Sequence, residues 1–333
     1  MNTRGSKRVI FHNPGHVAHK GWVDDNGKAW DVPSRVDRLV ETLARDSGAA
    51  TEWVYVTEAR SSTIGLVRAV HTPGLIEAIQ EAGRAATEDH PVKSSHDRDE
   101  KTNASAVHPG TFKQALLSIE CVVSAAELLL SGDPRTILVL SRPGGHHAGR
   151  DFHHGFGYFN TVGIAAHYLK EAGVVATLDF DAHHGDGTQD IFYEDPDVLC
   201  ISLHADPDKV LPHTGREHEN GKGSGLGATL NLPFPIGVTS EEYFGLLDAA
   251  CHKIRSFKPK HLVVAAGFDA HMNDHIGLPP LTYLGDGEYR RIGEMIASLG
   301  IGTLHILSGG YNQEVTSNAL LAYLAGVEAT GSA

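Results

Sequence analysis

Short aliphatic runs alternate with longer amphipathic segments along the second half of the 333-residue chain. Runs of this kind predict buried strands, and we expect them at residues 135–140, 174–180, 198–204, 261–268 and 302–310. Helices are expected between them at 161–173 and 239–257, and the second opens with a capping-box arrangement of Thr239 and Glu242. Nearly continuous apolar strands separated by helices indicate a parallel sheet that is covered on both faces.

The pattern of the first 120 residues is weaker. Amphipathic periodicity predicts helices at 33–48 and 72–88, and a third helix from Thr111 to Leu130 after a loop at 100–110. No segment repeats another, and no linker-like stretch divides the chain. We therefore expect one α/β domain over residues 1–333, with three α/β/α layers around a central, mainly parallel sheet.

Composition supports a folded protein of the cytoplasm. Hydrophobic residues make up 41% of the chain, which is enough for a substantial core. The first residues lack the apolar run of a secretory signal, and no stretch of about eighteen apolar residues predicts a membrane span. The three cysteines, Cys121, Cys200 and Cys251, are widely spaced and form no CxxC pair. This spacing is typical of buried thiols in a reducing compartment.

The charge of the chain excludes one class of partner. Its formal net charge is −13, from 28 basic and 41 acidic residues. Because no basic stripe is present to displace counterions, we do not expect a nucleic-acid partner. The negative charge would attract a cationic substrate, although simple solubility explains it equally well.

Polar clusters follow the carboxyl ends of all five expected strands. In parallel α/β sheets, ligands bind in the crevice at these ends. We therefore expect five loops to converge on one site. The clusters are the segments RPGGHHAG (142–149), DAHHGDGT (181–188), HADPD (204–208), GFDAHMND (267–274) and SGGYN (308–312).

Two of these loops carry a candidate metal site. Asp181 and His183 lie two residues apart, so their side chains point the same way at an extended strand end. Asp269 arrives from another strand end. Together they would form an open three-ligand site for a divalent metal, with room for water and substrate. Taken alone, an Asp-x-His unit is more often a turn, and the metal interpretation depends on the other clusters.

The histidine doublet His146–His147 is a candidate for proton transfer. The segment 179–186 offers two carboxylates beyond the ligands, Asp179 and Asp186, which would fix the histidine tautomers. General acid/base chemistry on a metal-bound water uses such pairs. Surface histidines are the commoner alternative, but the preceding Pro-Gly-Gly turn would direct both rings into the crevice.

Other residues near these loops have less definite roles. The Tyr311 hydroxyl, after two glycines, would donate to a developing oxyanion, unless Tyr311 is simply a core residue at a helix start. His153 and His154 have no obvious carboxylate partner in the sequence, so we interpret them as rim or structural residues. Side chains beside Asp269 are expected to form loop hydrogen bonds; they are His271, Asp274 and His275.

As a set, these motifs resemble the arginase–deacetylase superfamily, and within it the zinc-dependent histone-deacetylase-like branch. That branch includes bacterial acetylpolyamine amidohydrolases and acetoin-utilisation-type proteins. The similarity covers most of the chain and follows family order from about residue 105 to 312. The matching motifs are RPGGHHAG, GFGYFN, LDFDAHHGDGTQDIFY, SLHADP, GFDAH and SGGYN.

The resemblance implies a role for each matching residue. Zinc, one ion per chain, would bind Asp181, His183 and Asp269. His147 would be the principal general base and acid and His146 its electrostatic partner, with Asp186 and Asp179 as their respective carboxylates and Tyr311 as the oxyanion donor. The substrate would contact Gly155, Phe156, Leu211 and Gly309. A structural potassium ion would bind Asp179, Asp181, His183, Ser202 and Leu203.

Three departures from the family pattern bear on specificity. Gly144 stands where a proline is common, which predicts a less rigid histidine loop. Leu211 stands where many members have a phenylalanine opposite Phe156, which predicts a wider channel. The segment 83–104 is too short for the insertion with which some acetylpolyamine enzymes build a dimer and narrow the channel mouth, which weakens the polyamine-specific interpretation. The sequence leaves a homo-oligomer open.

The expected activity is metal-dependent hydrolysis of an acetamide on a primary amine, such as acetyl-lysine or an acetylated polyamine. An arginase-like ureohydrolase is disfavoured because that branch needs acidic residues where this chain has Gly185 and His271. A catalytically silent module that binds acylated ligands is also disfavoured, since every ligand and the tyrosine are retained.

The channel rim is expected to come from the loop 19–30 and from the 90–108 loop. Asp24 and Asp25 would attract a cationic substrate tail, or they would simply form a solvated turn.

Overall fold

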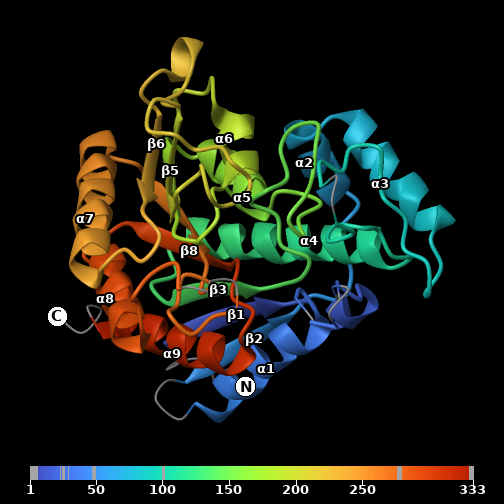
Figure 1. Ribbon diagram of the computed structural model, residues 1–333, viewed down its shortest axis with the longest axis horizontal. Helices are drawn as coiled ribbons and strands as arrows, with labels where there is room; N and C mark the ends of the chain where they lie inside the picture. The colour runs from blue at the N-terminus through green and yellow to red at the C-terminus, as the bar shows by residue number, and fades with distance from the viewer. Residues whose placement is uncertain are drawn as a thin grey trace.

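The computed structural model describes residues 7–22, 24, 27–28, 30–46, 50–99, 102–275 and 280–329. Its central sheet has eight strands in the order β2-β1-β3-β8-β7-β4-β5-β6, and every neighbouring pair is parallel (Figure 1). The strands are β1 (Arg8–His12), β2 (Thr51–Tyr55), β3 (Thr136–Leu140), β4 (Val175–Asp179), β5 (Val198–Ala205), β6 (Thr229–Phe234), β7 (His261–Ala266) and β8 (Gly302–Leu307).

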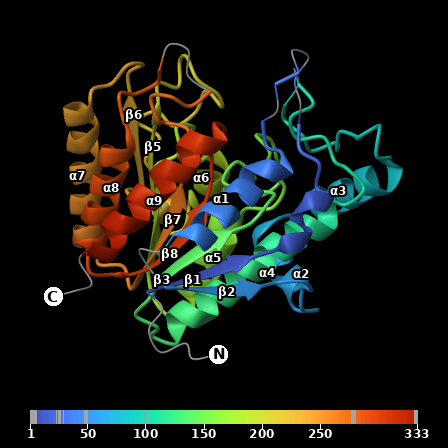
Figure 2. The ribbon, with the colours of Figure 1, turned by 90° about the horizontal axis from the view of Figure 1, so that it is seen from below.

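Helices cover both faces of this sheet, with α1 and α9 on one side and α4 on the other (Figure 2). The face of α1 holds α1 (Pro33–Arg45), α7 (Ser240–Phe257), α8 (Asp286–Ala297) and α9 (Gln313–Ala329). The opposite face holds α4 (Thr111–Leu130), α5 (Thr161–Lys170) and α6 (Asp186–Phe192), with α2 (Thr63–Val70) and α3 (Pro73–Ala85) outside them.

Alternating side chains of the strands supply both cores. Val9 and Phe11 of β1 pack in the core under α4 and α5, whereas Ile10 packs in the core under α1 and α9. Successive side chains of a strand point to opposite faces, and here both faces are covered by helices. This arrangement explains why the strand sequences are almost continuously apolar.

The structure confirms the expected fold class and most of the expected elements. The helix from Thr111 to Leu130 forms as expected, and the capping box of Thr239 and Glu242 is present. The helix expected at 161–173 ends earlier, at Lys170, and the chain leaves it through Gly173 at a positive φ of 139°. All three cysteines are free and buried.

Several elements escaped the sequence analysis, among them β1, β2, β6, α2, α6, α8 and α9. β2 and β6 are the two edge strands of the sheet, so part of their surface is exposed and their apolar runs are interrupted. β1 is fully buried, but it is short and follows basic residues.

Sheet order accounts for the position of the polar clusters. The five strands that precede them, β3, β8, β7, β4 and β5, are consecutive in the sheet. Because all of them run parallel, their carboxyl ends meet at one edge, as expected from the sequence. Among the described residues, no helix has the length and apolar character needed to cross a membrane.

Candidate active site

Asp181, His183 and Asp269 come together at the carboxyl ends of the neighbouring strands β4 and β7. Each offers a ligand atom within 4.8 Å of the others. His183 Nδ1 lies 3.1 Å from Asp181 Oδ1 and 3.0 Å from Asp269 Oδ2. The three residues that the sequence assigned to one metal thus share one position in the fold.

Backbone amides hold the two carboxylates in place. The Ala182 N–H donates to Asp269 Oδ1 at 2.8 Å, and the Gly309 N–H donates to Asp181 Oδ2 at 2.6 Å. A Cβ atom at position 309 would collide with both carboxylates. Glycine is therefore required where the loop after β8 passes the carboxylate pair.

The electrostatics of this cluster suit a divalent cation. Asp181 and Asp269 are each 1% exposed. Burial and the neighbouring Asp181 charge raise the pKa of Asp269 to about 7. Burial lowers the pKa of His183, but Asp181 and Asp269 outweigh it and raise that pKa to about 10. The two buried carboxylates and the imidazole together retain a proton at neutral pH. A divalent metal ion would replace that proton and balance the negative charge of the carboxylates.

The histidine doublet lies beside this cluster, and each ring has its own carboxylate. His146 Nδ1 is 2.8 Å from Asp179 Oδ2, and His147 Nδ1 is 2.7 Å from Asp186 Oδ1. The rings of His146 and His147 have centroids 3.9 Å apart, and the His147 ring lies 6.0 Å from that of His183. The pairing is the one expected from the sequence.

Hydrogen bonds from two other segments fix the loop that carries the doublet. The Thr188 N–H donates to the His146 carbonyl at 3.1 Å, and Asn160 Nδ2 donates to the Ala148 carbonyl at 2.9 Å. Asn160 ends the GFGYFN motif and also caps α5. The motif therefore supports the loop that carries the histidines through the Asn160 side chain.

The two histidines of the doublet differ in basicity. Burial lowers the pKa of His146, but the charges of Asp179 and Asp181 outweigh it and raise that pKa to about 9. For His147, burial and the adjacent His146 charge together hold the pKa well below its ordinary value, despite Asp186. These opposite pKa shifts favour a cationic His146 beside a neutral His147.

Tyr311 lies in the loop between β8 and α9, close to the cluster. Its backbone N–H donates to Asp274 Oδ2 at 2.8 Å, and the Arg35 guanidinium lies 5.1 Å from its ring centroid. Arg35 also donates to the Ser308 and Gly310 carbonyls, which anchors this loop. Burial raises the pKa of the Tyr311 hydroxyl well above its usual range, so at neutral pH the hydroxyl remains a hydrogen-bond donor.

Aromatic side chains from the N-terminal loop surround Tyr311 and Phe156. Trp30 lies 5.7 Å from Tyr311, Trp22 lies 6.2 Å from Phe156, and Phe156 lies 5.7 Å from Tyr311 between ring centroids. The Phe156 N–H donates to Ser105 Oγ at 2.9 Å. The loop 19–30 and the 90–108 loop, both expected at the rim, therefore each contact Phe156.

The remaining substrate-contact candidates differ in their surroundings. Gly155 adjoins the His147 ring, whereas Leu211 is 67% exposed on the segment between β5 and β6. Asp24 accepts from the Lys28 N–H at 2.9 Å and from Trp30 Nε1 at 3.1 Å, so it stabilises a turn. Asp25 lies outside the described residues.

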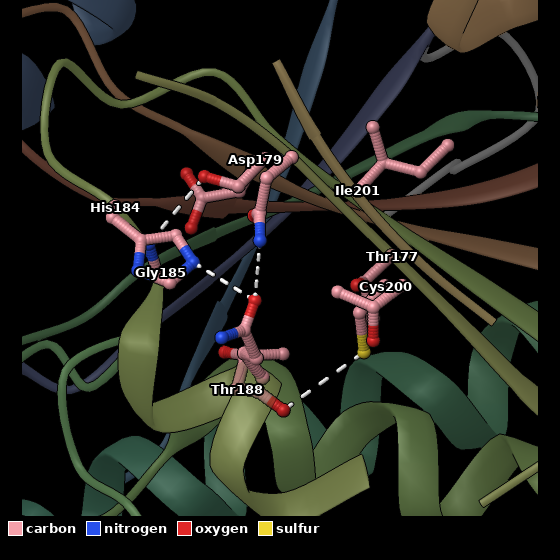
Figure 3. Close-up of a pocket in the computed structure, with 11 residues that line it drawn as sticks. Thr177, Asp179, His184, Gly185, Thr188, Cys200 and Ile201 are labelled. Carbon is pink, nitrogen blue, oxygen red and sulfur yellow. Dashed lines mark hydrogen bonds between the residues drawn. The ribbon is translucent and has the colours of Figure 1, made fainter. Parts of the chain in front are cut away.

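A small pocket of about 10 Å³ adjoins Asp179, between β4, β5, β6 and α6 (Figure 3). It has room for about one water-sized particle. Ser202, one of the expected potassium ligands, also borders it. Ser202 Oγ lies 2.9 Å from His204 Nδ1 and 3.5 Å from the Gly185 amide nitrogen.

The structure corrects the interpretation of the second histidine doublet. His154 does have a carboxylate partner, because its Nε2 lies 2.7 Å from Asp186 Oδ2. The sequence could not reveal this pair, since 32 residues separate the two and only the fold brings them together. His153 is fully buried and lies 2.6 Å from Ser94 Oγ, so it is structural and does not belong to the rim.

Of the residues beside Asp269, Asp274 and His271 form side-chain contacts as expected, whereas the contact of His275 is through its backbone. Asp274 accepts from the Tyr311 and Asn312 amides at 2.8 and 2.9 Å. His271 Nε2 lies 3.4 Å from Asp286 Oδ1. For His275, the backbone carbonyl accepts from Lys28 Nζ at 3.0 Å.

Comparison with known proteins agrees with this architecture. A family model described as the histone deacetylase domain matches residues 30–327. The chain belongs to this family. Its match includes every residue of the cluster, of both histidine doublets and of the loop at Tyr311.

The similar proteins of this family include acetylpolyamine amidohydrolases and a probable deacetylase, as their names give them. The chain is 38% identical over 209 residues to the acetylpolyamine amidohydrolase of Mycoplana ramosa, covering 62% of this chain and 60% of that enzyme. It is 33% identical over 308 residues to a probable deacetylase of Archaeoglobus fulgidus, covering 89% and 82%.

A solved structure, that of an acetylpolyamine aminohydrolase from Burkholderia pseudomallei, superposes with a TM-score of 0.82 at 30% identity, covering 96% of this chain and 98% of that one.

Proposed function

We propose that this protein is a zinc-dependent hydrolase that removes an acetyl group from a primary amine such as acetyl-lysine or an acetylated polyamine. The observation that carries the proposal is the cluster of Asp181, His183 and Asp269 beside the carboxylate-paired His146 and His147. The names of the relatives point to the same chemistry, although the aligned region spans only about 60% of the length of the acetylpolyamine amidohydrolases that match with 38–39% identity.

Asp181, His183 and Asp269 would hold the zinc ion, and their two carboxylates and one imidazole are ligands that zinc accepts. Bound there, the ion would supply Lewis-acid polarisation of the amide carbonyl and acidification of water. The amides of Ala182 and Gly309 keep the carboxylates oriented for this purpose.

His147 would carry the proton transfers. Its Nδ1–H donates to Asp186, which leaves Nε2 as the basic nitrogen. Because its pKa is held below the ordinary value, His147 is neutral at pH 7 and takes a proton from the attacking water. The protonated ring then returns that proton to the departing amine, so the products are acetic acid and a free amine, which at neutral pH become acetate and an ammonium ion. His146, held cationic by Asp179, would stabilise the negative charge that develops.

Tyr311 and the aromatic wall would position the acetamide. The protonated hydroxyl of Tyr311 would donate to the oxyanion that develops on the carbonyl oxygen. Phe156, Gly155 and Gly309 would line the channel for the alkyl chain, and the exposed Leu211 would lie at its rim.

A structural potassium ion would bind Asp179, Asp181, His183, Ser202 and Leu203. The water-sized pocket that borders Asp179 and Ser202 supports a small occupant beside this set. We expect a higher melting temperature in potassium chloride than in an equal concentration of tetramethylammonium chloride.

The three buried, free cysteines support a location in the reducing cytoplasm.

The proposal is tested by metal analysis and a substrate panel. Purified protein should contain one zinc ion per chain, and it should lose activity on chelation and regain it with zinc. The panel compares acetyl-lysine peptides, N-acetylputrescine, N8-acetylspermidine and small acetamides. Full zinc loading without cleavage of any acyl amide would favour a silent binding module, and two manganese ions per chain would favour a ureohydrolase.

Substitutions test the assigned roles. His147→Ala should lower kcat by about 10²–10⁴-fold, as expected for loss of a general base. Tyr311→Phe should lower it by about 10²–10³-fold, as expected for loss of an oxyanion donor. Tyr283→Phe is the matched control, because Tyr283 is 54% exposed, and it should leave kcat unchanged. Near-normal turnover in His147→Ala would refute the acid/base assignment.

A further inference from the structure

The carboxylate of Asp186 is shared by two histidines. His147 Nδ1 lies 2.7 Å from Oδ1, and His154 Nε2 lies 2.7 Å from Oδ2. The side chain of Asp186 is 10% exposed and that of His154 is 14% exposed. Burial raises the pKa of Asp186, but the two histidines outweigh it and lower that pKa well below its usual range. Asp186 is therefore an ionised, nearly buried carboxylate that accepts one hydrogen bond on each oxygen.

The ring of His154 is also held in place by stacking. It stacks on His147 with centroids 4.7 Å apart and planes 28° apart. It also stacks on Phe152, two residues earlier in the chain, with centroids 6.0 Å apart and planes 18° apart. The Arg98 guanidinium covers Phe152 at 3.4 Å from the ring centroid. His154 therefore has a fixed orientation, and its Nε2 is directed at the carboxylate.

The backbone after His154 is built for this contact. Gly155 and Phe156 both adopt left-handed conformations, with φ of 55° and 64°. A Cβ atom at position 155 would collide with the His147 ring. The tight turn brings His154 against His147 and at the same time presents Phe156 to Tyr311.

We infer that His154 is a positioning residue, which holds the second oxygen of Asp186 so that the first oxygen orients the His147 ring. This inference rests on the proposed role of His147. A carboxylate anchored through one oxygen is free to rotate about its Cβ–Cγ bond, whereas donors on both oxygens fix its plane. With the plane fixed, His147 keeps its proton on Nδ1 and its lone pair on Nε2, as a general base requires.

Two substitutions separate this role from simple packing. His154→Phe keeps a stacking ring and removes the donor, whereas His154→Gln keeps an amide donor and removes the ring. We expect His154→Phe to lower kcat about tenfold with KM unchanged within about twofold. His154→Gln should retain kcat within about threefold of the native value. The reverse order, with Phe active and Gln impaired, would overturn the inference.

Coupling to Asp186 is tested in a double variant. If His154 acts through Asp186, His154→Phe should lower kcat by less than about twofold in a protein that already carries Asp186→Asn. An undiminished tenfold loss there would contradict the inference. Ser94→Ala is the local control, because Ser94 contacts His153 in the same doublet and not Asp186. It should leave kcat unchanged within about twofold.

A spectroscopic readout does not depend on turnover. In zinc-loaded protein labelled with ¹⁵N-histidine, long-range proton–nitrogen spectra report which ring nitrogen of His147 carries the proton. We expect the Nδ1–H form in the native chain and a mixture of tautomers in His154→Phe. An unchanged tautomer in His154→Phe would overturn the inference, whether or not the native chain cleaves acetamides. A native chain that cleaves no acetamide would refute only the proposed function.

Metal analysis separates the inference from one remaining alternative. His147, His154 and Asp186 also form a group whose ligand atoms lie within 4.8 Å of one another. A cation bound there would displace the proton on His147 Nδ1 and the proton on His154 Nε2, and it would remove His147 from proton transfer. Two divalent metal ions per native chain, falling to one in His154→Phe, would overturn the inference. One divalent ion per chain in both proteins would support it.

Discussion

At the scale of single residues, two adjacent glycines of the histidine loop have opposite surroundings. A Cβ atom at Gly145 would collide with the Phe159 carbonyl and lie 2.7 Å from the Thr161 amide nitrogen. A Cβ atom at Gly144 would meet nothing within 4 Å. The family resemblance drew attention to Gly144 because a proline is common there, but in this fold Gly145 is the position that requires glycine.

Gly145→Ala should therefore be the damaging substitution of the pair. We expect it to lower the free energy of unfolding by about 1–3 kcal/mol, and to lower kcat because His146 and His147 follow directly. Gly144→Ala should change the unfolding free energy by no more than about 0.5 kcal/mol. Urea denaturation and initial rates of both variants check this pair, and equal effects would show that the loop yields at both positions.

At the scale of elements, one buried ion network connects the loop after β3, the start of α1 and the loop after β8. Arg142 is fully buried and donates to Asp31 from Nε at 3.0 Å and from Nη2 at 3.1 Å. Arg35 donates to Asp31 at 3.2 Å and also to the Gly310 carbonyl. The network therefore connects the loop that carries the histidine doublet with the loop that carries Tyr311.

Asp31→Asn should destabilise the protein strongly. Burial raises the pKa of Asp31, but Arg142, His19 and Arg35 outweigh it and lower that pKa well below its usual range. Loss of this charge would leave Arg142 buried without a counterion, which typically costs about 3–5 kcal/mol. Chemical denaturation measures the effect. Glu41→Gln is the control, because its pair with Arg45 is exposed, and it should cost less than about 0.5 kcal/mol.

At the scale of the whole molecule, six buried histidines make stability depend on pH. Burial lowers the pKa of each to about 3 or 4, against an ordinary value of 6.5; they are His16, His19, His71, His153, His204 and His305. All six are neutral in the folded protein at pH 5, whereas the unfolded chain would protonate them. Their contribution is complete above pH 6.5 and is lost as pH falls towards the folded pKa values.

The free energy of unfolding should therefore fall steeply between pH 6.5 and about 4. Each histidine contributes up to about 1.4 kcal/mol per pH unit in this window. His146 and His183 have pKa values raised to about 9 and 10, so their contribution to the free energy of unfolding is lost as pH rises above 6.5. Urea denaturation at successive pH values, with proton uptake measured by calorimetry, tests the expectation. Asp269, whose pKa is raised to about 7, titrates in the same window and offsets the effect of about one histidine. A flat profile from pH 6.5 to 5 would therefore contradict the expectation.

Much of the site could be predicted because it depends on local order along the chain. The polar clusters directly follow apolar strands, and parallel strands place their carboxyl ends at one edge. Asp181 and His183 share one loop, and Asp179 and Asp186 flank them. Edge strands such as β2 escaped prediction, since their exposed faces interrupt the apolar pattern from which strands are recognised.

By itself, the sequence determined the α/β class, the strand ends that bear polar residues, and the family. The tertiary structure alone decided which side chains share a partner. His154 meets Asp186 across 32 residues, Asp31 meets Arg142 across 111, and Arg35 meets Gly310 across 275. Local sequence encodes periodicity and turns, which act over a few residues. Contacts between distant segments depend on sheet order and layer packing, which no local pattern encodes.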